Sequence, residues 1–379
     1  MRLDELPDPI FIARPNALRR LVEELSSESH IAVDTEANGL YAYREQVCLI
    51  QFSTPTTDYL VDTLALDDLS PLAAVFENPN IEKVFHASEY DLIILHQDFE
   101  FSVVSLFDTM IAARILGWNA VGLGSILEDL FDIRVNKKYQ RANWGQRPIS
   151  KEMMNYAQID THFLLPLRDQ IELELKESGR WPLAVEDFLR CSQVDSLNHR
   201  NGNGDCFRIK GAHDLKPQRA AVLRELCIFR DRKARSMDRP LFKVIGDKSL
   251  LEIAEKAPKS NKELEKIRGI SKRQVNWLGE GLLASVKRGL AAKPLAPVRK
   301  PRPNYQYLNR VDQLRSWRIR KAQSFGVMSD VVMPKDLLLD LAEKNPGSKS
   351  ELNLILESVP WRLGEFGDEL LSLLGSSKK

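Results

Sequence analysis

Short apolar runs bounded by polar residues recur through the first half of the chain and predict buried strands. The clearest runs are at residues 30–34, 46–52, 58–62 and 81–85. Apolar residues at helical spacing follow at 108–116 and over a longer stretch at about 151–174. The first half of the chain is therefore predicted to contain both strands and helices.

Acidic residues stand beside two of these strands. Asp34 and Glu36 come at or just past the end of the first run, and side chains two residues apart in a strand project from the same face. Asp91 lies in the first turns of a helix that is predicted to follow the run at 81–85. Each position has a structural alternative: a polar strand end for the first pair, and an acidic residue favoured by the helix dipole for Asp91.

A third cluster lies inside the longer helical stretch. Tyr156 and Asp160 are four residues apart, so the phenol and the carboxylate share one helix face. Asp108 opens the predicted helix at 108–116 and fits the role of an N-cap. We give Asp108 only a secondary functional role.

Carboxylates gathered without basic partners repel one another, and divalent cations relieve that repulsion. If the three clusters meet in the fold, their oxygen atoms suit Mg²⁺ or Mn²⁺. Two cations in a cage of carboxylates are typical of enzymes that hydrolyse phosphodiesters.

The three clusters occur in the order and context of a known family. Residues 33–36 (VDTE), 84–91 (VFHASEYD) and 156–160 (YAQID) resemble the motifs of the 3′→5′ exonuclease superfamily with four acidic residues and a tyrosine, found in proofreading domains and ribonuclease D. The likeness spans roughly residues 8–190, and residues 137–148 also resemble the ribonuclease D pattern. Asn155, five residues before Asp160, disfavours the histidine variant of the superfamily.

The resemblance implies an α/β RNase H-like domain, a mixed sheet flanked by helices. It also implies two Mg²⁺ or Mn²⁺ ions about 3.5–4 Å apart, held by Asp34, Glu36, Asp91 and Asp160. Asp34 is expected to bind both ions, with Glu36 and Asp160 completing one site and Asp91 supporting the other. Tyr156 is expected to orient the attacking water, because a phenol with an ordinary pKa near 10 is a poor base at neutral pH.

Two further groups are candidates for contacts with the substrate. A basic stretch with aromatic residues suits phosphate contacts and base stacking, and it contains Lys137, Lys138, Arg141 and Trp144. A solvated loop is the alternative for this stretch. His86 precedes the helix of Asp91 and could contact the substrate, although a structural histidine fits the position at least as well.

Net charge is unevenly distributed along the chain. Residues 1–207 carry 18 Lys and Arg against 33 Asp and Glu, residues 208–302 carry 25 against 10, and residues 303–379 carry 11 against 10. An acidic catalytic half would repel a polyanion, so the basic segment is predicted to hold the substrate phosphates. Attraction between the two halves across a domain interface is the alternative.

An internal repeat with a spacing of 88 residues runs through the second half of the chain. For example, Phe229-Arg230 matches Trp317-Arg318, and the apolar positions recur at helical spacing, so each unit is predicted to be a small all-α bundle. Each unit resembles the HRDC domain shared by RecQ-type helicases and ribonuclease D, the second less closely than the first. An exonuclease domain followed by two HRDC modules resembles bacterial ribonuclease D.

The predicted domain boundaries follow from these resemblances and from the linker composition. We predict an exonuclease domain at residues 1–197, a linker at 198–213, HRDC domain 1 at 214–294, a Pro-rich basic linker at 295–304 and an HRDC-like domain 2 at 305–379. From its charge, the first module is expected to bind RNA phosphates more strongly than the second. The second is expected instead to pack against the exonuclease domain.

The resemblance implies a 3′→5′ exoribonuclease that releases 5′-mononucleotides and trims the free 3′ ends of tRNA precursors. A DNA exonuclease acting in repair is the alternative within the enzyme class. A catalytically silent RNA-binding scaffold is a third possibility, which the four intact carboxylates disfavour.

Other features of the sequence bear on where the protein acts. The cysteines (Cys48, Cys191, Cys206 and Cys227) have neither metal-binding nor framework spacing, so free thiols in a reducing cytoplasm are expected. No apolar run approaches the roughly 20 residues needed to cross a bilayer, and an acidic N-terminus predicts no signal peptide. No membrane association and no obligate protein partner are expected.

Overall fold

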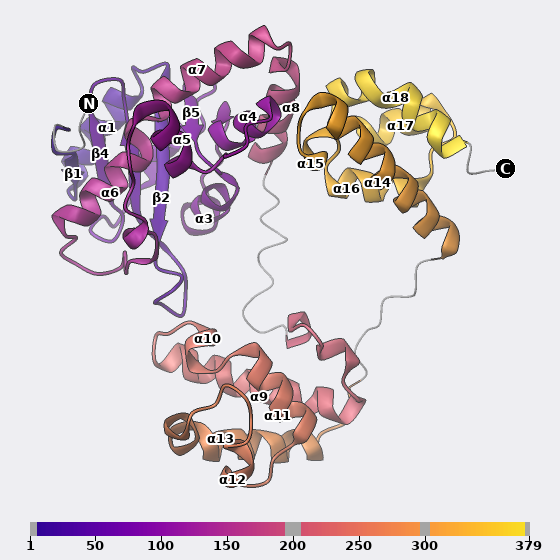
Figure 1. Cartoon of the computed structure of the whole chain (residues 1–379). Helices are drawn as coiled ribbons and strands as arrows, with labels where there is room; N and C mark the ends of the chain where they lie inside the picture. The colour runs from indigo at the N-terminus through magenta and orange to yellow at the C-terminus, as the bar shows by residue number, and fades with distance from the viewer. Residues whose placement is uncertain (1–5, 194–205, 296–303, 376–379) are drawn as a thin grey trace. The chain divides into compact units, whose positions relative to one another are not determined.

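A computed structural model describes residues 6–193, 206–295 and 304–375 (Figure 1). These residues form two compact units. One unit contains most of the N-terminal half together with residues 304–375, and the other contains residues 37–46 and 206–295. Most of the predicted linker at 198–213 and nearly all of the predicted linker at 295–304 lie outside the described residues.

The N-terminal half is built on a six-stranded mixed sheet with the strand order β1-β4-β3-β2-β5-β6. β3 and β4 pair antiparallel, whereas β1 with β4, β2 with β5 and β5 with β6 pair parallel. The strands are Ile10–Ile12 (β1), His30–Ala37 (β2), Val47–Ser53 (β3), Asp58–Asp62 (β4), Glu82–Phe85 (β5) and Leu106–Asp108 (β6). The expected mixed sheet is therefore confirmed, and the four predicted runs correspond to β2, β3, β4 and β5.

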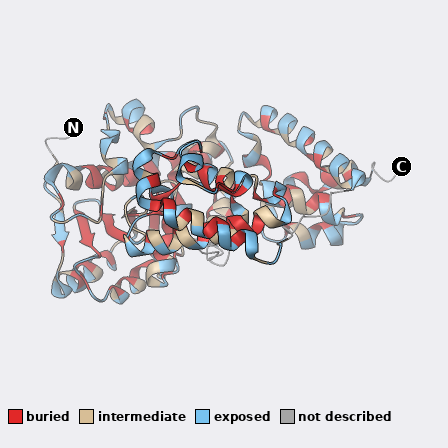
Figure 2. Cartoon of the chain, turned by 90° about the horizontal axis from the view of Figure 1, so that it is seen from below, coloured by how far each residue is buried: buried red, intermediate tan, exposed pale blue. Residues whose placement is uncertain are grey.

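Helices flank this sheet. They are Pro15–Leu25 (α1), Ala73–Phe76 (α2), Glu89–Phe99 (α3), Thr109–Leu116 (α4), Leu123–Phe131 (α5), Lys151–His162 (α6), Leu164–Glu177 (α7) and Trp181–Ser192 (α8). α6 packs on β3 and β4, α7 on β5, and α8 on β6. Figure 2 shows buried residues on the strands and on the inner sides of the helices, as expected for helices covering a sheet.

The helix predicted at about 151–174 is in fact two helices. α6 ends at His162, and α7 begins at Leu164. Pro166 lies in the first turn of α7, where it has no N–H group to donate to the carbonyl of His162. A continuous helix would lose that bond, whereas a new helix tolerates proline in its first turn.

The C-terminal half consists of two helical modules. The first contains α9 to α13, namely Pro217–Ser236, Leu241–Val244, Asp247–Lys256, Asn261–Leu264 and Lys272–Ala291. The second contains α14 to α18, namely Tyr305–Phe325, Ser329–Val332, Lys335–Lys344, Lys349–Leu356 and Pro360–Gly375. The predicted pair of all-α bundles is confirmed, and a shift of 88 residues carries α10 onto α15 and α11 onto α16.

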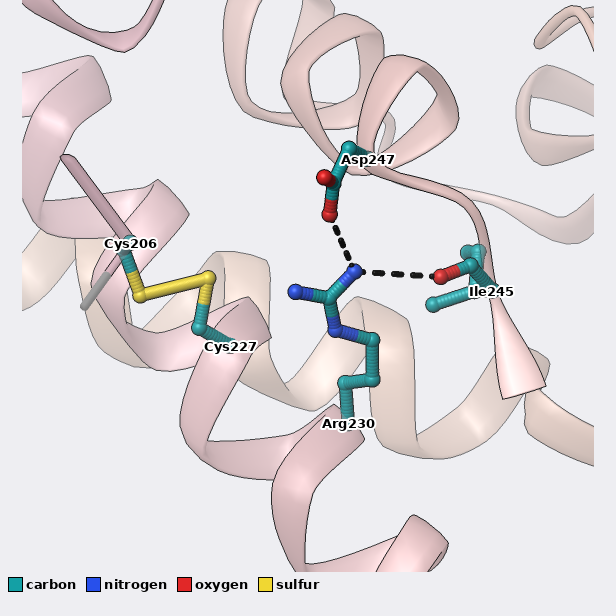
Figure 3. Close-up of a disulfide and its surroundings, with 5 residues drawn as sticks. All are labelled: Cys206, Cys227, Arg230, Ile245 and Asp247. Atoms are coloured by element: carbon teal, nitrogen blue, oxygen red, sulfur yellow. Dashed lines mark hydrogen bonds and ion pairs between the residues drawn. A yellow bond between two sulfur atoms is a disulfide. The ribbon is translucent and has the colours of Figure 1, made fainter. Parts of the chain in front are cut away.

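Equivalent arginines make equivalent bonds in the two modules. In the first, Arg230 donates from Nη1 to the carbonyl of Ile245 at 3.2 Å and to Asp247 at 2.6 Å (Figure 3). In the second, Arg318 donates from Nη1 to the carbonyl of Met333 at 3.0 Å. The repeat seen in the sequence therefore extends to the hydrogen bonds that join the first helix of each module to the turn after its second helix.

A second equivalent position differs between the modules. Gln274 in α13 donates from Nε2 to the carbonyl of Val244 at 3.3 Å. Its counterpart Arg362 in α18 donates from Nε to the carbonyl of Val332 at 3.1 Å. The arginine keeps the internal bond, and the rest of its guanidinium group remains for other partners.

Those partners lie on α8, within the same compact unit. Arg362 is fully buried, and it donates to Asp187 at 2.8 and 2.9 Å and to Glu186. Glu186 also accepts the main-chain N–H of Trp361 at 2.6 Å, and Val331 joins the apolar cluster that includes residues of α4 and α8. The expected packing of the second module on the exonuclease domain is confirmed by these contacts.

The structure corrects the prediction of free thiols in one respect. Cys206 and Cys227 form a disulfide, with Cα atoms 6.1 Å apart (Figure 3), whereas Cys48 and Cys191 remain thiols. Ile209 and Ala212 lie in the same core cluster as this disulfide. Residues that were predicted to belong to the linker at 198–213 therefore pack in the first helical module.

Candidate active site

Three of the predicted carboxylates converge. Asp34 and Glu36 lie inside β2, which continues to Ala37, beyond the predicted run, and they project from one face of that strand. Asp160 lies on α6, which packs on β3 and β4. One carboxylate oxygen from each of the three lies within 4.8 Å of the others. Strand and helix thus bring together residues more than a hundred positions apart in the sequence.

Asp91 reaches the same cluster from α3. It is buried, in the first turn of that helix, and it accepts a hydrogen bond from the hydroxyl of Thr35. Thr35 lies between Asp34 and Glu36 in β2, so this bond joins the start of α3 to that strand. After burial, repulsion from Asp91 is one of the causes that raise the pKa of Asp34, Glu36 and Asp160.

All four carboxyl groups are harder to ionise than ordinary ones. Burial raises the pKa of Asp34, and the charges of Asp91, Asp160 and Glu36 raise it further. Burial also raises the pKa of Glu36, with repulsion from Asp160 and Asp91 adding to the effect. For Asp91 and Asp160, burial is again the largest cause and raises the pKa to about 7. The cluster therefore holds its negative charge at a cost in free energy.

This set of residues fits divalent cations. Among the described residues, no lysine or arginine forms an ion pair with any of the four carboxylates. Carboxylate oxygens are the ligands preferred by Mg²⁺ and Mn²⁺. A bound cation would neutralise the four carboxylates, which no lysine or arginine neutralises among the described residues.

Tyr156 lies beside the cluster, as its helical spacing predicts. Its hydroxyl lies close to the carboxyl group of Asp160, and its side chain is largely buried against Trp144 and Leu49. Burial and the neighbouring carboxylates raise the pKa of Tyr156 well above its ordinary value. The phenol therefore stays protonated and can orient a neighbouring group by hydrogen bonding.

Asp108 holds the framework around Asp91. It caps α4 by accepting from the main-chain N–H groups of Met110 and Ile111 at 2.8 and 3.1 Å. It also accepts from the N–H of Ala87 and from both the N–H and the hydroxyl of Ser88. The predicted N-cap is confirmed, and the same carboxylate ties the turn before α3 to β6.

The structure contradicts the predicted stacking role of Trp144. Trp144 is 1 % exposed and packs in a core cluster with Ile149 and Tyr156, so no face of its indole ring is available to a base. The ring centroids of Trp144 and Tyr156 are 6.1 Å apart. Trp144 therefore supports Tyr156 from within the core.

Arg147 explains why that tryptophan is buried. Its guanidinium group donates to both oxygens of Asp62 at 2.8 and 2.6 Å, and to the carbonyls of Cys48 and Trp144 at 2.8 and 2.6 Å. These bonds draw the segment before α6 onto β3 and β4. The sequence does not predict these hydrogen bonds, because Arg147 cannot be told apart there from the other basic residues of the same stretch.

The remaining candidates for substrate contacts differ in exposure. Lys137, Lys138 and Arg141 are exposed on a short 3-10 helix, so their side chains are accessible to solvent. His86 is half-buried, and its Nδ1 lies 2.8 Å from the hydroxyl of Thr109. Burial lowers the pKa of His86. The geometry of His86 thus agrees with the structural alternative.

Two protein-family models match the chain. The model described as 3'-5' exonuclease matches residues 9–176, and the HRDC domain model matches residues 219–286 and again residues 308–374. The chain therefore combines a domain that matches the 3'-5' exonuclease model, which includes the four carboxylates, with two HRDC domains.

Individual relatives indicate which family of 3′–5′ exonucleases the chain resembles. Ribonuclease D from Pseudomonas paraeruginosa is 29 % identical over 98 % of this chain and 99 % of that protein. The structure of Escherichia coli RNase D, an exoribonuclease involved in structured RNA processing, is 26 % identical, with 98 % and 99 % coverage and a TM-score of 0.72. The catalytic core of RRP6 from Trypanosoma brucei is 32 % identical over 77 % of this chain and 82 % of that core, with a TM-score of 0.64. The chain belongs to the ribonuclease D family.

The family also includes longer proteins. The chain spans between 24 % and 31 % of the length of the first curated plant and yeast relatives of the RRP6 type that it matches. Within the part of the chain that the structure describes, no helix is both long enough and apolar enough to span a bilayer.

Proposed function

We propose that this protein is a metal-dependent 3′→5′ exoribonuclease that releases nucleoside 5′-monophosphates from the free 3′ ends of RNA. The convergence of Asp34, Glu36 and Asp160 carries this proposal. One buried carboxyl group (Asp91) and three half-buried ones, without a basic partner among the described residues, are a poor arrangement for stability alone. The same arrangement of carboxyl groups is well suited to binding divalent cations next to a phosphodiester.

Each residue of the cluster has a role in this proposal. Asp34, Glu36, Asp91 and Asp160 hold two divalent cations, Mg²⁺ or Mn²⁺, which when bound activate a water molecule and stabilise negative charge on the phosphate. Tyr156 orients the attacking water through its protonated hydroxyl, which lies beside Asp160. Lys137, Lys138 and Arg141 contact the substrate backbone from their exposed helix.

The substrates that we propose are tRNA precursors with free 3′ ends, in the cytoplasm. Support comes from full-length similarity to ribonuclease D proteins, one of which acts on structured RNA. DNA has the same phosphodiester, and the carboxylate cluster by itself does not distinguish the two polymers. A 3′→5′ DNA exonuclease is therefore an outcome of the test below.

The first helical module binds the phosphate groups of the RNA through its basic side chains. Residues 208–302 carry 25 basic against 10 acidic side chains, and Lys272 and Arg273 at the start of α13 are exposed. A surface of this kind binds nucleic acid with an affinity that falls as salt rises. The second module, with nearly balanced charge, is instead packed on the exonuclease domain.

A comparison of RNA and DNA oligonucleotides of the same sequence tests the proposed function. Each is labelled at its 5′ end and incubated with Mg²⁺, Mn²⁺ or EDTA, with a 3′-blocked copy as control. We expect a ladder of RNA products one nucleotide apart with either metal, and no products with EDTA or with the blocked end. Equal degradation of DNA would favour the DNA exonuclease, and degradation in EDTA would contradict a metal-dependent enzyme.

The raised pKa values predict how pH affects the metal-free protein. Asp91 and Asp160 have a pKa of about 7 in the folded chain, against an ordinary value of 3.8. The folded state therefore binds more protons than the unfolded state between about pH 4 and 7, and its stability falls as pH rises through that range. We expect a lower free energy of unfolding at pH 8 than at pH 5 in EDTA, measured by urea denaturation.

Cation binding should reverse this loss, because a metal ion replaces the protons. Adding Mn²⁺ at pH 8 should restore the free energy of unfolding, and calorimetry should show a Mn²⁺ affinity that rises steeply between pH 5.5 and 7. A Mn²⁺ affinity independent of pH in this range would contradict the assignment of these carboxylates as ligands.

A further inference from the structure

A glutamine lies in a fully buried strand of the sheet. All seven residues of β3 are buried, and Gln51 has no exposed surface. Its neighbours in the strand, Ile50 and Phe52, are apolar. Burying an amide costs free energy unless its donors and acceptor are paired. We therefore expect the amide of Gln51 to have a hydrogen-bond partner in the protein.

That partner is the carboxylate of Asp34. The Nε2 group of Gln51 donates to Oδ2 of Asp34 at 3.2 Å, between the neighbouring strands β3 and β2. A hydrogen bond to an ionised acceptor is stronger than one between neutral groups. It also limits the rotation of the carboxylate, and Asp34 must be correctly rotated to meet Glu36 and Asp160.

The other end of the amide is unpaired. Oε1 of Gln51 is buried and has no hydrogen-bond partner among the described residues. Side chains alternate along a strand, so Gln51 shares its face of the sheet with Leu49 and Ser53. Leu49 packs in a cluster with Tyr156, and Ser53 bonds to the hydroxyl of Thr161 at 2.7 Å. The free acceptor therefore lies on the side covered by α6, beside the carboxylate cluster.

We propose that Gln51 is a positioning residue for the metal-binding carboxylates. Its amide N–H holds Asp34 in the orientation that converges with the other ligands, and its amide oxygen accepts a hydrogen bond from water bound at the cluster. The inference rests on the proposed function, since it takes the cluster to be a metal site. Groups that orient a metal ligand in this way usually change metal affinity by about 10- to 100-fold when removed.

Replacing Gln51 with methionine tests this role. Gln51→Met keeps the length of the side chain and removes both amide groups. We expect the Kd for Mn²⁺, measured by calorimetry without RNA, to rise about 10- to 100-fold. The stability of the metal-free variant should be equal or higher, because a buried, partly unpaired amide has been replaced by an apolar group. The Mn²⁺ concentration that gives half-maximal hydrolysis should rise in parallel, with the rate recovering at saturating Mn²⁺.

Gln158 provides a matched control. It is also buried, and its Nε2 donates to a carboxylate, Asp58, at 2.7 Å and to the carbonyl of Pro7 at 2.8 Å. Asp58 is not part of the cluster, and it keeps Ser53 and His162 as partners. We expect Gln158→Met to lower stability while leaving the Kd for Mn²⁺ unchanged. Gln51→Leu serves as a second variant if Gln51→Met does not fold.

The outcomes separate this inference from the proposed function. Wild-type Mn²⁺ affinity in the folded Gln51 variants would overturn the positioning role alone, as would an equal loss of affinity in Gln158→Met. A wild-type protein that binds no Mn²⁺ would overturn the proposed function and the role of Gln51 with it. A selective loss of affinity in the Gln51 variants supports both.

Discussion

Asp34→Asn should abolish hydrolysis and, in the absence of metal, stabilise the protein. The amide has nearly the shape of the carboxylate and lacks its charge. RNA cleavage should fall by at least about 10³-fold, because the central ligand of the cluster is lost. At pH 8 in EDTA the variant should be more stable than the wild type, because the pKa of Asp34 is raised by burial and by three neighbouring carboxylates. Single-turnover cleavage assays and urea denaturation measure the two effects.

The opposite signs of these effects make the prediction specific. If Asp34 had only a structural role, its replacement by asparagine would lower the stability of the protein. If Asp34 had no role, the replacement would change neither cleavage nor stability. Asp67→Asn, at an exposed position outside the cluster, is the control and should leave activity and stability unchanged. An Asp34→Asn protein that cleaves RNA at the wild-type rate would refute the assigned active site.

Arg362→Met should separate the second helical module from α8 and destabilise the unit by about 3–5 kcal/mol. The substitution leaves Glu186 and Asp187 without the guanidinium group that now neutralises them, and the side chain of Glu186 is only 3 % exposed. Leaving one buried charge without its partner costs far more stability than replacing both charges of the pair with apolar groups. Urea denaturation measures the loss, and limited proteolysis should release the second module (residues 304–375) faster than in the wild type.

Two comparisons distinguish a buried ion pair from a general weakening of the interface. Arg190→Met removes an exposed pair with Asp336 in the same region and should cost no more than about 1 kcal/mol. Combining Arg362→Met with Glu186→Gln should recover part of the lost stability, because the unpaired charge is removed as well. Additive losses in the double variant would argue against a direct interaction.

The candidate site was predictable from sequence because each of its residues follows a short-range rule. Asp34 and Glu36 obey the period of a strand, and Tyr156 and Asp160 obey the period of a helix. Asp91 and Asp108 occupy helix starts, where acidic residues are favoured. Their spacings fix which side chains share a face, and the family resemblance then indicates that the faces meet.

Long-range contacts account for what the sequence did not reveal. Trp144 lies among basic residues, as a stacking residue would, and only the bonds of Arg147 to β3 and β4 show that it is buried. Gln51 stands in an apolar run whose neighbouring strand cannot be known before the sheet is built. The pairing of Cys206 with Cys227 likewise depends on how a turn packs against α9.

Position 362 shows how a duplicated module can acquire a fixed place in a protein. In the first copy, an amide at the equivalent position 274 satisfies one carbonyl inside its own bundle. In the second copy, a guanidinium group satisfies the matching carbonyl and has donors left over for the acidic side chains of α8. The arginine of the second copy thus adds an anchor to α8 and makes the same internal bond as the glutamine of the first copy. Two copies of one bundle can thus differ in their external contacts through a single side chain, while the hydrogen bond that closes each bundle is the same.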